Sequence, residues 1–192
     1  HTDPGVGVCC LELQVWRIGG SPPAPRLEVV SAPNDWAKPV TEAPTERNAA
    51  YRRFFQQLLD KFREANPGET NAHKASGQSW LSTAAGRTGF AFAWVFKRDN
   101  RFSVELYIDR GDRDLNKQAF DALWLERAEI EAELGMPLSW ERLDKRRACR
   151  IASHTDGSIT MAAADLAMVR EFALAAMPKF RTVLAPRIRG LG

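Results

Sequence analysis

The chain has 192 residues, a net charge of +3, and 44% hydrophobic and 27% charged residues. This length allows one globular domain with a buried core, and the ordinary composition excludes disordered, collagen-like and disulfide-scaffold proteins. No apolar run approaches the roughly 20 residues of a membrane-spanning helix, so we expect no membrane partner. The chain starts without an initiator Met, a signal peptide or a cofactor motif, and its three cysteines lack zinc spacing. We therefore expect a cytoplasmic fragment that needs no cofactor.

The N-terminal part is predicted to be separate from the rest. Residues 8–18 alternate apolar and polar residues in part and contain β-branched and aromatic members, which predicts a strand. Four prolines in the following stretch exclude a helix and leave room for a short edge strand at residues 27–30. Residues 31–44 are typical of an extended linker. We therefore expect two parts, residues 1–40 and 41–192.

Helical spacing of apolar residues begins after the linker. The stripe over residues 51–62 predicts a helix that starts after Thr45 and stops at residues 66–68. Strands over residues 90–97 and 102–108, joined by a turn, predict a β-hairpin. We expect the larger side chains of its first strand to face the core: Phe90, Phe92, Trp94 and Phe96.

The remaining elements are predicted to be two helices and one strand. A long helix is expected over residues 114–134, capped by Asp112 or Asp114 and ended by Gly135, followed by a strand over residues 147–153. We expect Ser158 or Thr160 to cap the last helix, Pro178 to kink it or to open a second one, and Pro186 to end it.

These elements predict an α+β fold. We expect a small antiparallel or mixed sheet, made of the hairpin and one further strand, packed against three or more helices.

Five stretches over about residues 46–188 carry a family resemblance. They are YRRFFQQLLDKFRE, NAHKASGQSWLSTAAGRTGF, VELYIDRGDRDLNKQAFDAL, EIEAELGMPLSWERLDKRRACRIA and PKFRTVLAPRI. Together they resemble a bacterial and archaeal family of unknown function that is found C-terminal to RecB-like PD-(D/E)xK nuclease-like domains. Residues 1–40 resemble the end of such a nuclease-like domain. The resemblance therefore implies that the N-terminal strand segment remains from a truncated upstream domain.

The resemblance implies that the nuclease metal motif lies upstream of this chain. Such nucleases need a carboxylate and an E-x-K or D-x-K element, in which carboxylates bind Mg²⁺ and the lysine orients water. Glu12 is followed by Leu13 and Gln14, so residues 1–45 contain no such arrangement. We expect no nuclease activity from this chain and assign no catalytic residue.

A polar loop between the first helix and the hairpin is a candidate nucleic-acid site. Lys74, Ser76 and Arg87 supply groups for phosphate contacts, and Trp80 has the ring to stack on a base. The alternative is a surface connection that Trp80 anchors in the core.

A basic cluster near the predicted third strand is a second candidate. Arg147 and Arg150 belong to the densest run of positive charge and suit a phosphate backbone. Glu141 and Asp144 lie within this run, so ion pairs inside the domain are the favoured alternative.

An acidic cluster is a weaker candidate. Period-two geometry puts Glu105, Tyr107 and Asp109 on one face of a strand, near Lys117 at the next helix start, and carboxylates so placed can bind a metal or transfer protons. The favoured alternative is a solvent-facing strand surface. No histidine completes a metal site at ligand spacing, so we assign no metal.

Two functions follow as hypotheses. The first is a non-catalytic accessory module of a nuclease-like protein that binds nucleic acid through the phosphate backbone. The second is a protein-interaction module that forms homodimers or docks on the upstream nuclease-like domain. The strand at residues 8–18 supports the second, because it has no obvious partner strand in the sequence.

Overall fold

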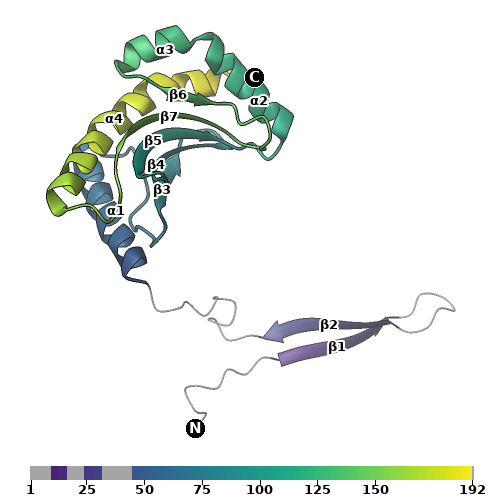
Figure 1. Cartoon of the computed structure of the whole chain (residues 1–192). Helices are drawn as coiled ribbons and strands as arrows, with labels where there is room; N and C mark the ends of the chain where they lie inside the picture. The colour runs from purple at the N-terminus through teal and green to yellow at the C-terminus, as the bar shows by residue number, and fades with distance from the viewer. Residues whose placement is uncertain (1–9, 17–23, 32–44, 192) are drawn as a thin grey trace. The chain divides into compact units, whose positions relative to one another are not determined.

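Figure 1 shows the computed structural model, which describes residues 10–16, 24–31 and 45–191. The chain divides into two compact units between Ala43 and Pro44. The predicted linker, apart from Ser31, and the outer ends of the first predicted strand lie outside the described residues. Each unit is described by itself.

The first unit contains two paired strands. β1 (Cys10–Trp16) pairs antiparallel with β2 (Ala24–Ser31), with Leu13 opposite Leu27. The prediction that the first strand has no partner is therefore wrong. β2 is also longer than the predicted strand at residues 27–30. It includes Pro25, which lies near the start of the strand, where a missing backbone N–H is tolerated.

The second unit is built on a five-stranded antiparallel sheet with the order β3-β4-β5-β7-β6. Its strands are β3 (Trp80–Ala84), β4 (Phe90–Phe96), β5 (Arg101–Ile108), β6 (Ser139–Glu141) and β7 (Cys149–Asp156). The hairpin of β4 and β5 and the later strand confirm the prediction. β3 and β6 were not predicted, because both are short and lie in polar stretches. With the helices below, the α+β class is confirmed.

Four helices accompany this sheet: α1 (Glu46–Ala65), α2 (Arg113–Leu125), α3 (Arg127–Leu134) and α4 (Ala163–Gly190). α1 and α4 pack against each other and lie along one side of the sheet (Figure 1). The predicted apolar stripe of α1 is buried, and Thr45 caps this helix by accepting from the Asn48 N–H. No helix in the described residues has the length and apolar character that crossing a lipid bilayer requires.

The long helix predicted over residues 114–134 is two helices. Asp112 caps α2 and Gly135 ends α3 in a left-handed conformation with φ of 65°, as predicted. The helix breaks at Glu126, whose backbone has φ of −96° and ψ of 10° and whose N–H bonds back to Leu123 O. The break lets each short helix bury its own apolar residues, including Leu123 on α2 and Ile130 on α3.

The last helix also differs from the prediction. α4 continues through both Pro178 and Pro186, so the predictions that Pro178 opens a second helix and that Pro186 ends this one are wrong. Each proline removes one backbone hydrogen bond at a cost of about 3 kcal/mol, and burial of the surrounding residues, such as Phe180 and Leu184, offsets this loss. Ser158 and Thr160 bond to each other in the preceding turn, so neither caps the helix.

Alternation along β4 and β5 gives the sheet two different faces. The helix-covered face buries the large residues of β4, as predicted, and Trp94 donates its indole N–H to Ala173 O of α4 at 3.3 Å. The intervening residues of β4, such as Ala91 and Ala93, are small and face the other way. We call this other side, which none of the described helices covers in Figure 1, the open face.

Candidate functional site

Strand register arranges the side chains of the open face in rows across the sheet. One row places Trp80 opposite Val95, Val95 opposite Ser103 and Ser103 opposite His154. The next runs from Ser82 through Ala93 and Glu105 to Ala152 and Ser139, and the third from Ala84 through Ala91 and Tyr107 to Arg150 and Glu141.

A groove lies on this open face. It has a volume of about 410 Å³, and side chains of four neighbouring strands line it: Trp80, Ser82, Ala91, Ala93, Val95, Glu105, Tyr107 and Arg150. Neighbouring strands are about 4.8 Å apart, so the groove spans roughly 14 Å from β3 to β7. Its volume lies within the range of small-molecule and cofactor sites.

Small residues form the floor of the groove and aromatic residues rise beside it. Ala91 and Ala93 contribute only methyl groups, which leaves the sheet hollow at the centre of β4. Trp80 borders the hollow from the edge strand and is 49% exposed, an unusual exposure for a tryptophan. Tyr107 lines it from β5 and is partly buried. A flat ring can therefore lie on the apolar floor of the groove and contact an aromatic side chain beside it.

A buried carboxylate lies at one side of the groove. Glu105 is 3% exposed, and its Oε2 accepts a hydrogen bond from Ser103 Oγ at 3.1 Å. Lys97 Nζ lies 3.3 Å and Arg150 Nε 3.2 Å from the same oxygen. A buried carboxylate requires such partners, because desolvation of an unpaired charge costs several kcal/mol.

A second carboxylate extends this ionic network. Arg150 Nη1 donates to Glu141 Oε2 at 3.0 Å, and Lys97 Nζ lies 3.8 Å from Glu141 Oε1. The network therefore joins β5, β7, β6 and the residue that follows β4. Its two cations and two anions balance, and they hold Arg150 in place beside the groove.

His154 borders the same network. Its Nε2 lies 3.9 Å from Glu141 Oε1, and neither ring nitrogen has a hydrogen-bond partner in the described part of the chain. Burial lowers the pKa of His154, and the nearby cations Lys97 and Arg101 lower it further. The imidazole is therefore neutral at neutral pH.

The structure brings together only part of the predicted nucleic-acid site. Trp80 and Arg150 line the same groove, whereas Lys74 and Ser76 lie in the loop that leads into β3. Arg87 donates to Ile188 O at 2.8 Å and also bonds Leu191 O, at the end of α4. Since Trp80 is half exposed, the idea that it anchors the loop in the core is wrong.

The basic cluster forms the ion pairs that the favoured alternative predicts. Arg147 Nη2 donates to Asp109 Oδ2 at 2.7 Å and lowers the pKa of that carboxyl. Arg142 pairs with Asp121 at 2.8 Å and with Asp144. Phosphates would have to compete with these carboxylates for the arginines.

The residues of the acidic cluster have separate partners. Glu105 faces the groove, whereas Asp109 pairs with Arg147 beyond the end of β5. Lys117 is 6% exposed, and its ammonium donates to Leu143 O and Ala148 O, both at 3.1 Å, so it fastens the segment between β6 and β7. The described residues contain no group of three or more acidic, histidine or cysteine side chains placed to hold a metal.

Sequence reasoning missed three residues of the groove network: Lys97, Glu141 and His154. Glu141 lies on β6, which was not predicted. Lys97 follows β4, a strand for which the sequence assigned a role only to the core-facing residues. The available signal was the alternation of alanine with aromatic residues in β4, since a strand with small residues on one face leaves a hollow there.

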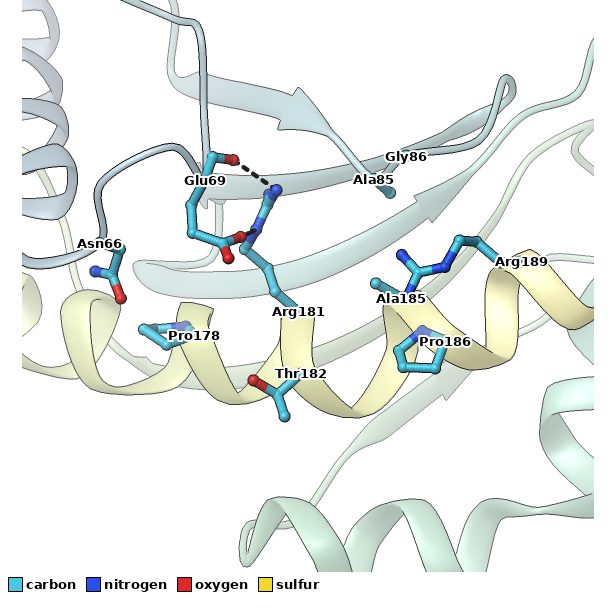
Figure 2. Close-up of a pocket in the computed structure, with 10 residues that line it drawn as sticks. All are labelled: Asn66, Glu69, Ala85, Gly86, Pro178, Arg181, Thr182, Ala185, Pro186 and Arg189. Carbon is cyan, nitrogen blue, oxygen red and sulfur yellow. Dashed lines mark hydrogen bonds and ion pairs between the residues drawn. The ribbon is translucent and has the colours of Figure 1, made fainter.

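A second hollow lies beside α4. This hollow has a volume of about 400 Å³. Figure 2 shows the residues that line it, which include Asn66, Thr182 and Arg189. Arg181 crosses it and donates from Nε to Glu69 Oε2 and from Nη2 to Glu69 O, both at 2.6 Å. Its Nη1 donates to Thr83 Oγ1 at 3.1 Å. Because this guanidinium joins α4 to the Glu69 loop and β3, we interpret the hollow as structural.

One comparison with known proteins gives a match, and this match lies within the second unit. The sequence model of a family described as a domain of unknown function (DUF4268) matches residues 50–188. The chain matches no curated protein and no solved structure.

Proposed function

Since the chain belongs to the DUF4268 family of domains of unknown function, we propose its function from the groove itself. The domain binds single-stranded nucleic acid on the open face of its sheet. The observation that carries the proposal is the half-exposed Trp80 beside an alanine floor and Tyr107.

This arrangement suits unpaired bases. Proteins that bind single strands stack bases on aromatic side chains, often on a sheet surface, because every base has an apolar face. Ala91 and Ala93 leave room for a ring to approach the sheet, and the ring of Trp80 or Tyr107 supplies the stacking partner. A base pair inside a duplex keeps its faces stacked and does not offer them to such a surface.

Phosphate contacts contribute less to the proposed binding than the sequence predicts. Arg147 and Arg150 are held in ion pairs, whereas Lys74 is exposed in the loop that leads into β3. If the domain contacts about two phosphates, its affinity for a single strand falls by less than about tenfold between 50 and 200 mM salt.

The proposed role is accessory. The resemblance of residues 46–188 to domains that follow RecB-like nuclease-like domains supports binding of the strand on which an upstream domain acts. The nuclease-like domain is accordingly the proposed partner within the same protein. This part of the proposal is an analogy between domain arrangements.

The competing hypothesis of a docking or homodimer module loses its main argument. It depended on an unpaired first strand, and β1 pairs with β2. A homodimer that covers the open face remains an outcome of the test: sedimentation would show a dimer, and Trp80→Ala would convert it to a monomer.

The test is fluorescence anisotropy with labelled single-stranded and double-stranded oligonucleotides. We expect the single strand to bind more tightly and Trp80→Ala to weaken this binding by about 1–3 kcal/mol, which is about 5- to 150-fold. The matched control is Trp124→Ala, which removes a tryptophan of similar exposure (39%) on α2. Equal binding by the Trp80→Ala protein and the unmodified protein would contradict the proposal.

A further inference from the structure

The two oxygens of the buried Glu105 carboxylate differ in their contacts. Ser103, Lys97 and Arg150 all approach Oε2, at 3.1, 3.3 and 3.2 Å. No hydrogen bond reaches the other oxygen, Oε1, from any residue that the structure describes. The Glu105 side chain lines the groove and is only 4% exposed. The groove therefore contains a charged acceptor oxygen that none of the described donors occupies.

We propose that this oxygen makes the groove select bases that carry an exocyclic amino group. The inference depends on the proposed function, since it specifies which base occupies the groove. A ligand N–H that reaches this oxygen from the groove adds a charge-assisted hydrogen bond, which is stronger than one between neutral groups. Cytosine, adenine and guanine each present an amino group at the edge of the ring, and Asp and Glu carboxylates are known acceptors for the amino group of cytosine.

Uracil and thymine lack this group. Both present one ring N–H between two carbonyl oxygens, and these oxygens would lie close to the Glu105 carboxylate. Repulsion between the acceptors disfavours the pairing. The structure thus discriminates by an attractive contact for one class of base and a repulsive one for the other.

Neighbouring donors complement the acceptor. Arg150 lines the groove beside Glu105, and Tyr107 lies in the same row of the sheet as Arg150. Ser82 lies in the same row as Glu105. Cytosine and adenine have a ring nitrogen acceptor directly beside their amino group. A donor next to the Glu105 acceptor matches this pattern.

The ionic network fixes the geometry of this contact. Glu105 lies on the central strand of the sheet, and its Oε2 is held by groups from three positions in the fold. The carboxylate therefore does not need to be ordered when a base arrives, so less conformational entropy is lost on binding.

The experiment compares oligo-dC with oligo-dU of equal length, because these pyrimidines differ at the amino or carbonyl position and in the ring N–H beside it. We expect the unmodified protein to prefer oligo-dC by about tenfold or more. Glu105→Gln keeps the size of the side chain and removes its charge, and we expect this variant to reduce the preference to about twofold or less. Ser103→Ala is the matched control: it removes a partner of Oε2, leaves Oε1 in place and should retain the preference.

A modified ligand gives the answer without any variant. Oligo-dC whose amino groups each carry two methyl groups cannot donate, and we expect it to bind as weakly as oligo-dU. Equal binding of oligo-dC and oligo-dU, with the dependence on Trp80 intact, would overturn the selectivity and leave the proposed function standing. Loss of the dependence on Trp80 would overturn both. A folded Glu105→Gln protein with the full preference would also exclude Glu105 as the selective group.

Discussion

The two faces of the sheet are built from the same strands and have opposite characters. Toward α1 and α4, β4 places Phe92 and Trp94, which are both fully buried. Toward the open face the same strand places Ala91 and Ala93, and β5 places Glu105. A shift of one residue in sequence thus separates close packing from a hollow with a charged side chain.

This difference shows where each type of substitution should act. The helix-covered face consists of interlocked aromatic side chains, such as Phe54 against Phe96 with ring centroids 4.8 Å apart. Removal of atoms there leaves a cavity and lowers stability. The open face has space already, so changes to its floor should alter binding more than folding.

The largest expected effect is loss of stability on the covered face. Trp94→Ala removes a fully buried ring and its hydrogen bond to Ala173, and we expect the free energy of unfolding to fall by about 3–5 kcal/mol. Its neighbour Val95 faces the groove, and Val95→Ala should cost about 1 kcal/mol or less. Urea unfolding followed by circular dichroism measures both. Similar losses for the two variants would remove the distinction between the faces.

An effect on binding is expected from filling the groove. Ala91→Leu adds a larger side chain to the floor, opposite Tyr107, and we expect it to weaken single-strand binding by about tenfold or more, which is about 1.4 kcal/mol. The exposed Ala164 on α4 offers the same substitution as a control, with no change in affinity expected. Anisotropy titrations of the two proteins decide the question, and unchanged binding by Ala91→Leu would place the ligand elsewhere.

The smallest expected effect is a pH dependence from His154. Burial, Lys97 and Arg101 lower its pKa in the folded protein, and Glu141 and Asp99 oppose this only in part. The unfolded chain therefore binds the proton more readily, and stability falls as the pH drops through the ordinary histidine pKa of about 6.5.

Replacement of this histidine should remove that part of the pH dependence. We expect the His154→Leu protein to lose less stability than the unmodified protein between pH 7.5 and pH 5, in urea titrations at each pH. The carboxyls Asp109 and Asp121 have lowered pKa values and lose their stabilising charge only at lower pH, below this window. A slope that is unchanged in His154→Leu would show that another group titrates.

Much of the fold followed from local patterns, and the groove did not. The stripe of α1, the turn at Asn100 and the caps at Thr45 and Asp112 each depend on residues a few positions apart. β3 has only five residues, two of them hydroxylic, so its sequence resembles a polar loop until β4 pairs with it. The helix break at Glu126 has no proline or glycine to indicate it.

The groove depends on strand register between distant segments. Glu105 meets Arg150 because β5 pairs with β7, and Arg150 meets Glu141 because β6 joins the other edge of β7. No local sequence pattern predicts these strand pairings. Period-two alternation predicted that Glu105 and Tyr107 share a face, and Trp80 was singled out for stacking, but only the sheet order brings the three together.

The most direct test of single-strand binding on the open face is an NMR titration that follows the indole signals of the six tryptophans while a single-stranded oligonucleotide is added. We expect a large shift of the Trp80 indole, together with the amides of Ala91 and Ala93, and almost no change at Trp94 on the opposite face. Shifts confined to the loop around Arg142 and Arg147, with Trp80 unmoved, would contradict it.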